Sequence, residues 1–336
     1  MVFHGNFTFM KYDKDEEVKM VQRLLFIAVV SGLLLLLSGC NKASFDAVPD
    51  KDVMATVNIQ EPSLTFFDIE GNNVATWPLK KSYTGATLWQ DNTVVLYGFG
   101  LAKANVYGLD GEHLYDLKTG TGVTNIYVKN HKAYVANGET NQVQVYDANG
   151  ELIAEHKVGN YPMSMYEHEG NLYVINYKDT TLSVLDAEHL QIQQEWSIDK
   201  SANGLIVPEK TNELWIGGHG EGAKPNRYVK KYDLKTGELI GTIEMPLMPI
   251  EFAQDQKLIY TVSHGTNDIY AVNHKGEVSW RMHVGANPFA IAIFKDYVIV
   301  AGYDDHTLYM IQNGEIIREI PVDKGPFKLL VREGSM

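Results

Sequence analysis

The chain has 336 residues, of which 45% are hydrophobic and 21% charged, and its formal net charge is −13. This composition is typical of a globular protein and excludes a disordered or collagen-like chain. The acidic balance argues against nucleic acid as a partner, because contacts to phosphates need clustered Lys and Arg.

The first forty residues read as an export signal. Residues 24–37 are fourteen consecutive uncharged, mostly apolar residues that follow Arg23. This run is short for a bilayer-spanning helix, which needs ~20 residues. A basic flank, a short apolar core and small residues before a cleavage site describe a secretory signal, and an uncleaved signal anchor is the alternative. Residues 1–19 are unusual before such a signal because Asp13, Asp15, Glu16 and Glu17 are acidic, so Met20 is a more natural start than Met1.

The end of this run, Leu37-Ser38-Gly39-Cys40, resembles the lipobox of bacterial lipoproteins, L-[AS]-[GA]-C, at all four positions. The resemblance implies cleavage between Gly39 and Cys40 and attachment of lipid, such as palmitate, to Cys40. Residues 1–39 would be removed and residues 40–52 would form a lipidated tether. The lipid bilayer would then be a partner through the Cys40 anchor. The protein would lie on the outer face of a bacterial cell membrane, or in the periplasm or at the outer membrane if the host has two membranes.

Cys40 is also the only cysteine, which excludes an internal disulfide framework and a cysteine-based zinc site.

A repeat of about 39 residues runs through residues 53–331. Turn glycines followed by a strand pattern recur at Gly71, Gly111, Gly150, Gly237, Gly276 and Gly314, in steps of 40, 39, 87, 39 and 38. The step of 87 holds two units and an insertion, which gives seven units. Regular spacing of this size, with alternating or apolar runs between turn residues, predicts an all-β, seven-bladed β-propeller over residues 53–336, with four strands in each blade.

The first unit is one strand short. It offers only residues 54–58, 64–68 and 73–79, whereas the chain ends on Pro326 to Val331, a segment that matches the inner strands at 162–166 and 288–293. We therefore expect the C-terminal strand to supply the inner strand of the first blade. This closure would leave no unpaired inner edge.

Several units resemble the YVTN family of β-propeller repeats. Tyr134-Val135-Ala136-Asn137 and Tyr173-Val174-Ile175-Asn176 match the family's strand motif, and Val158 to Pro162 and Val284 to Pro288 match its closing motif. The second and fifth units depart from it. The resemblance implies a propeller found in secreted and lipid-anchored prokaryotic proteins, and it carries no catalytic residues to this chain.

Loop lengths distinguish the two faces of the predicted ring. The turns between first and second strands and between third and fourth strands are tight, whereas the other connections are longer and share the opposite face, which we call the long-loop face. Loops held by a rigid scaffold often carry function, and tyrosines beside amides suit a binding surface. The candidate binding residues on this face are Tyr83, Tyr97, Phe99, Asn137, Asn160, Tyr161, Asn176, Tyr177, Asn203, His219, His264, Asn287, Tyr303 and His306. The alternative for each Asn is that it only caps a turn.

No reaction signature or cofactor motif stands out. Residues 217–227, the longest insertion, lack the Gly-Lys-Ser/Thr of a phosphate loop, and the sequence has no His-Glu-x-x-His and no Gly-x-Ser-x-Gly. We therefore expect a non-enzymatic scaffold that binds an unknown protein, glycan or cell-wall ligand, without a cofactor. The alternative is a propeller enzyme, similar to lactonases or streptogramin lyase, with His219, His264 and His306 or a metal at the mouth of the pore.

Overall fold

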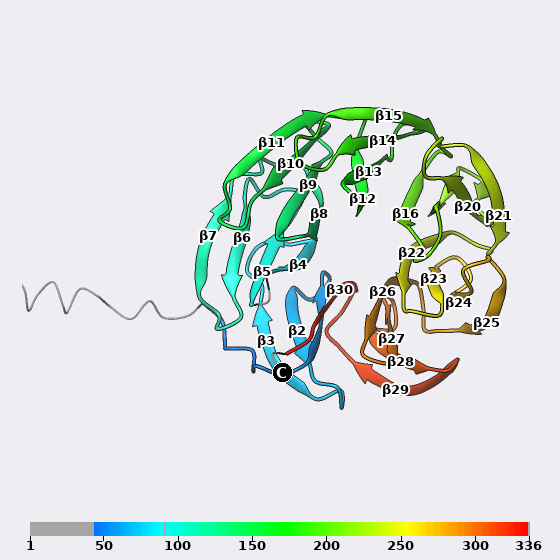
Figure 1. Cartoon of the computed structure of the whole chain (residues 1–336). Coiled ribbons are helices and arrows are strands. Elements are labelled where there is room, and N and C mark those ends of the chain that lie inside the picture. Colours follow the sequence, from blue (N-terminus) through cyan, green and yellow to red (C-terminus); the bar gives the residue numbers. More distant parts are fainter. Residues whose placement is uncertain (1–43, 91, 335–336) are drawn as a thin grey trace, which may run out of the picture. The chain divides into compact units, whose positions relative to one another are not determined.

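The computed structural model describes residues 44–90 and 92–334, so the signal region and Cys40 lie outside the described residues. Seven four-stranded antiparallel sheets follow one another in a ring (Figure 1), which confirms the predicted seven-bladed β-propeller. The described residues belong to one compact unit. Within the described ranges, no helix is long and apolar enough to cross a membrane.

The strands of the blades, numbered in chain order, are these. Blade 1 holds β1 (Val53–Asn58), β2 (Ser63–Phe67), β3 (Asn73–Pro78) and β30 (Pro326–Arg332), and blade 2 holds β4 (Gly85–Trp89), β5 (Thr93–Tyr97), β6 (Ala104–Gly108) and β7 (His113–Leu117). Blade 3 holds β8 (Val123–Lys129), β9 (Lys132–Asn137), β10 (Gln142–Tyr146) and β11 (Leu152–Lys157), and blade 4 holds β12 (Pro162–His168), β13 (Asn171–Asn176), β14 (Thr181–Asp186) and β15 (Ile192–Ser197). Blade 5 holds β16 (Ala202–Ile206), β17 (Glu213–Gly218), β20 (Tyr228–Asp233) and β21 (Leu239–Glu244), with an added hairpin of β18 (Gly220–Glu221) and β19 (Lys224–Pro225). Blade 6 holds β22 (Pro249–Gln254), β23 (Ile259–Ser263), β24 (Asp268–Val272) and β25 (Val278–His283), and blade 7 holds β26 (Pro288–Phe294), β27 (Tyr297–Gly302), β28 (Thr307–Gln312) and β29 (Glu315–Pro321).

The ring closes as the sequence predicts. β30 pairs antiparallel with β1, from Val53 opposite Arg332 to Asn58 opposite Pro326. The seven inner strands, which are β30, β4, β8, β12, β16, β22 and β26, each contact the inner strand of the next blade. No inner edge is left open, because the two ends of the propeller share one sheet.

The cores lie between neighbouring blades. The second and third strands of the blades are almost fully buried except β20 of blade 5, and Trp77, Trp89 and Trp215 are among the largest side chains with no exposure to solvent. The predicted turn glycines all have positive φ, from 72° at Gly237 to 91° at Gly276, as a tight strand connection requires of a residue without a Cβ. The glycine therefore recurs because every blade needs the same backbone geometry at this turn.

Residues 44–52 pack against the propeller as a strap. The Ser44 and Val48 amides donate to the carbonyls of Gly111 and Leu109 at 2.8 and 2.7 Å, and the Phe45 ring stacks on Trp77 at 4.7 Å. A Cβ on Gly111 would overlap the carbonyl of Phe45, so this glycine allows the close approach. The sequence predicts a tether over residues 40–52, whereas the strap bonds show that the part from Ser44 onward is docked.

Candidate functional site

Ring side chains form an arc around one mouth of the central channel. Consecutive ring centroids lie 5.1 to 6.3 Å apart, within the range of favourable aromatic contacts. We call the following residues the aromatic arc: Phe99, Tyr161, Tyr177, His219, His264, Phe289, Tyr303 and Phe327. The arc therefore extends over blade 2 and blades 4 to 7 and reaches the closing strand β30.

The arc lies on the long-loop face because of where its members occur in the blades. Phe99, Tyr177 and His264 follow second strands, and Tyr161 lies in the link between blades 3 and 4. Phe289 directly follows the proline that begins β26, and Phe327 occupies the same position in β30. Each inner strand begins at this face, so its first side chains reach the mouth.

Tyr161 is held in place from both sides. Its backbone has a positive φ of 58°, and its amide donates to Asn141 Oδ1 at 2.9 Å. Lys178 Nζ lies 4.2 Å from the ring centroid, a cation–π contact. The ring is thus positioned before any ligand arrives.

Below the arc, the channel contains a cavity of about 490 Å³ lined by all seven inner strands. This volume lies in the range of small-molecule sites. The third residue of every inner strand lines it, and these residues are Lys328, Thr87, Asn125, Ser164, Gly204, Glu251 and Ala290. We call the polar members, together with Asn203, the polar belt. At 3.3 Å per residue the belt lies roughly 7 Å inside the mouth.

The strand register places several belt residues at one level. Lys328, Asn125 and Glu251 each lie opposite the penultimate residue of the second strand in their blade. Ala290 has the same place in blade 7, between the blades that carry Glu251 and Lys328. Its small side chain carries no charge and is buried in the core between blades 7 and 1.

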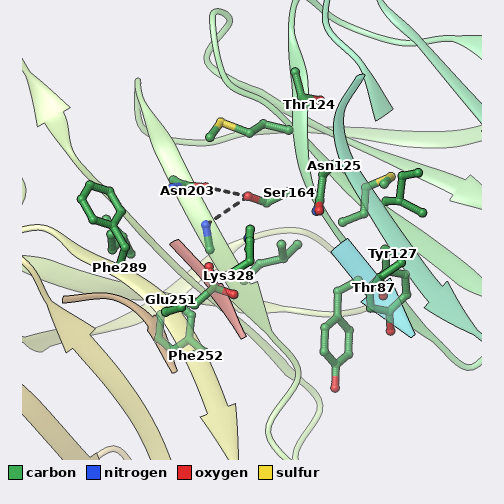
Figure 2. A pocket seen from close by; sticks show the side chains of 18 of the residues that line it. Thr87, Thr124, Asn125, Tyr127, Ser164, Asn203, Glu251, Phe252, Phe289 and Lys328 are labelled. Atoms are coloured by element: carbon green, nitrogen blue, oxygen red, sulfur yellow. Dashed lines mark hydrogen bonds between the residues drawn. The ribbon is translucent and has the colours of Figure 1, made fainter. Parts of the chain in front are cut away.

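Two hydrogen bonds orient the amides of the belt. Ser164 Oγ donates to Asn203 Oδ1 at 2.7 Å (Figure 2), and Tyr97 Oη donates to Asn125 Oδ1 at 3.1 Å. Both bonds use the amide oxygens. The two Nδ2 groups make no hydrogen bond within residues 44–90 and 92–334, so they remain donors for a ligand.

Lys328 and Glu251 bring charge into the cavity (Figure 2). The Glu251 carboxylate raises the pKa of Lys328, against the opposing effect of burial, so Lys328 keeps its charge at neutral pH. Neither group forms a direct ion pair or hydrogen bond with another side chain of the described ranges. Their charges are thus free to be matched by a ligand.

His219 and His264 meet within the arc, with ring centroids 5.1 Å apart. Burial, and secondly the neighbouring His264, lowers the pKa of His219, so this imidazole is neutral at pH 7. His264 Nδ1 lies 3.0 Å from Asn287 Oδ1. His219 Nδ1 and His264 Nε2 are buried and have no hydrogen-bond partner among the described residues.

The structure divides the predicted site residues into three groups. Phe99, Tyr161, Tyr177, His219, His264 and Tyr303 form most of the arc, and Tyr97 and Asn203 line the cavity. The others are engaged in turns and links: Tyr83, Asn137, Asn160, Asn176, Asn287 and His306. Asn137 caps its turn, because its Oδ1 accepts from the Glu139 and Thr140 amides. Asn176 is buried and donates to Thr181 and Ser183, but its Oδ1 has no hydrogen-bond partner among the described residues, so it is not a turn cap. His306 Nδ1 lies 3.0 Å from the Tyr303 carbonyl and is not part of the histidine pair.

Sequence reasoning missed the interior of the channel. Lys328, Glu251 and Ser164 line the cavity, and Phe289 and Phe327 complete the arc. Alignment of the inner strands on their opening prolines would have revealed them, because each lies one or two positions after Pro162, Pro249, Pro288 or Pro326.

The insertion at residues 217–227 folds into the β18–β19 hairpin. Lys200 Nζ contacts Glu221 Oε1 at 2.7 Å, and a second cavity of about 220 Å³ lies beside the hairpin. Across the part of the chain that the structure describes, no group of three or more His, Cys, Asp or Glu side chains could hold a metal ion.

No family model matches the sequence, and no curated protein matches it. Solved propellers match the structure. A functionally unknown protein from Desulfotomaculum acetoxidans is 10% identical with a TM-score of 0.72, covering 85% of this chain and 100% of its own. Apo AztD from Citrobacter koseri is 12% identical with a TM-score of 0.60, covering 85% of this chain and 98% of its own. Virginiamycin B lyase from Staphylococcus aureus is 16% identical with a TM-score of 0.61, covering 71% of this chain and 84% of its own. At these identities the likeness establishes the propeller fold alone.

Proposed function

We propose that this chain is an exported, lipid-anchored binding protein without enzymatic activity, which takes its ligand at the long-loop mouth of the channel. The aromatic arc above a polar cavity carries this proposal. Tyrosine and phenylalanine rings offer large contact areas at low entropic cost, and the cavity below supplies donors and charges that fix orientation. The ligand is a protein, a glycan or a cell-wall component with a part small enough to enter the mouth.

The sequence motif at Leu37 to Cys40 supports the export and lipid-anchoring parts of this proposal. Lipid on Cys40 would hold the propeller at a membrane without a spanning helix. Mass spectrometry of the native protein tests this part, since a diacylglyceryl group on an N-terminal Cys40 supports it and an unmodified Cys40 contradicts it.

The binding proposal is tested by truncating the arc. The double variant Tyr161→Ala/Tyr177→Ala removes two neighbouring rings, and Tyr228→Ala is the matched control, because Tyr228 is 41% exposed on β20 outside the arc. Binding to an array of peptides, glycans and cell-wall fragments should fall about tenfold or more in the double variant and stay unchanged in the control. Equal binding by all three proteins, with equal thermal midpoints, would exclude this mouth as the site.

A second candidate function is a propeller enzyme, and the histidine pair is the observation that favours it. A neutral, half-buried His219 beside His264, with a free ring nitrogen on each, could act as a general base toward a substrate in the mouth. Lactones are the substrate class to test first. If lactone opening occurs, we expect His219→Ala to reduce it by roughly a hundredfold, the usual contribution of a general base. Absence of turnover in the wild-type chain would reject this candidate.

A further inference from the structure

The polar belt contains two opposite charges that form no direct ion pair among the described residues. Lys328 in blade 1 and Glu251 in blade 6 are at the same level of the channel, with Ala290 at the equivalent position of the intervening blade 7. They are close enough for the carboxylate to influence the ammonium, yet no direct ion pair joins them. A gap of this kind leaves each charge with unused hydrogen-bonding capacity inside a half-enclosed cavity.

The donors of the belt are spread around the ring, on blades 1, 3 and 5. Lys328 brings three N–H donors, and the amide groups of Asn125 and Asn203 add two donors each, because their oxygens already accept bonds from Tyr97 and Ser164. Glu251 is the one carboxylate among the residues that line this cavity. The belt can therefore hold one carboxylate and one ammonium at the same time.

We propose that the cavity binds the α-amino-acid group of a zwitterionic ligand, with its carboxylate on Lys328 and its ammonium on Glu251. This inference rests on the proposed binding function and specifies the chemistry that the belt would recognise. A group that carries an ammonium and a carboxylate on the same carbon fits a site whose opposite charges are near each other but not in contact. Charge-assisted hydrogen bonds of this kind are shorter and stronger than neutral ones.

The aromatic arc indicates which side chain the ligand should carry. Phe327 and Phe289 precede Lys328 and Ala290 on their strands, and their rings are 5.4 Å apart at the mouth. A side chain that projects outward from the belt would meet these rings. An aromatic amino acid, which carries an α-amino-acid group and a ring, is therefore the simplest probe.

The test uses the intact chain and four related probes, which are L-phenylalanine, its amide, N-acetyl-L-phenylalanine and N-acetyl-L-phenylalanine amide. Calorimetry should show the zwitterion bound about tenfold or more tightly than the amide, which lacks the carboxylate, and than the N-acetyl compound, which lacks the ammonium. The compound without either charge should bind most weakly. This series needs no variant, so it stands even where a channel substitution disturbs folding.

Two variants then assign the charges. Lys328→Met keeps the length of the side chain and should remove the preference for phenylalanine over its amide, whereas Glu251→Gln should remove the preference over the N-acetyl compound. Lys129→Met, at the exposed far end of β8 and outside the residues that line the cavity, is the matched control and should retain both preferences.

Equal binding of the four probes, or preferences unaffected by both substitutions, would overturn this inference. Loss of array binding in the Tyr161→Ala/Tyr177→Ala variant would still support the proposed function in that case. The two failures are therefore distinguishable.

Discussion

Around the mouth of the channel, the role of each side chain depends on how deeply that side chain is buried. His219 is half-buried beside His264, and Tyr177 covers its other side with a ring centroid 6.3 Å away. Asn176, one residue before Tyr177, is fully buried and donates to Thr181 and Ser183. Tyr177 thus contributes to the mouth of the channel, whereas Asn176 contributes to the interior of its own blade. Residue type alone does not reveal this difference.

The lowered pKa of His219 makes stability depend on pH in a definite direction. The unfolded chain binds a proton at His219 as the pH falls through its ordinary pKa of 6.5, whereas the folded chain does so only at lower pH. Stability therefore decreases as the pH falls through this window, because the unfolded state binds more protons. We expect the free energy of unfolding, measured in urea, to fall less between pH 7.5 and 5.5 in His219→Phe than in the wild type.

The variant His131→Phe controls for the loss of one imidazole, because His131 is exposed in the β8–β9 turn. An identical decline in His219→Phe and in the wild type would contradict the assigned burial effect.

At the level of strands, β30 determines whether the ring can close. All six residues of β1 are buried, and β30 covers one edge of this strand along its whole length. A chain ending at Gly325 would expose an apolar, unpaired edge, a template for aggregation. We expect this truncation to abolish cooperative thermal unfolding and to yield aggregates in size-exclusion chromatography.

Removal of residues 333–336 alone is the control, because it leaves β30 and its pairing with β1 intact. A peptide of residues 326–336 added to the truncated chain should restore part of the soluble fraction. A soluble truncated chain with an unchanged thermal midpoint would show that β30 is dispensable.

The sequence predicts strands well here because turns and burial repeat with the blade. Gly71, Gly111 and Gly150 mark equivalent tight turns, and Pro326 marks an inner strand even at the far end of the chain. The channel lining follows no such rule. The third inner-strand position carries Lys328, Glu251 or Ala290 according to the blade, since it borders a common cavity whose lining need not repeat. The strap was missed for a related reason: its backbone bonds to blade 2 and its side-chain bonds to blade 1 leave no apolar period.

For the whole molecule, the strap determines which face an anchor at Cys40 would hold near a membrane. β1 is the second strand of its blade, so the chain reaches it from the face of the tight turns. Ser44 is bonded to Gly111 in the β6–β7 turn on that same face. The four steps from Cys40 to Ser44 span about 14 Å at most. With the proposed lipid in place, the tight-turn face lies next to the membrane and the aromatic arc faces away.

This orientation predicts unequal labelling of two engineered thiols in blade 3. Ala148 is exposed in the tight β10–β11 turn, and Thr140 is exposed at the other end of β10, on the long-loop face. In liposome-bound lipidated protein, a large polyethylene-glycol maleimide should modify Thr140→Cys rapidly and Ala148→Cys several-fold more slowly, because the bilayer limits access to the near face. Each variant has a single free thiol, since Cys40 is the only cysteine of the natural chain and would be bound to lipid.

The same variants in a form that begins after Cys40 should react equally in solution. Faster labelling of Ala148→Cys on liposomes would reverse the orientation and place the mouth of the channel against the membrane.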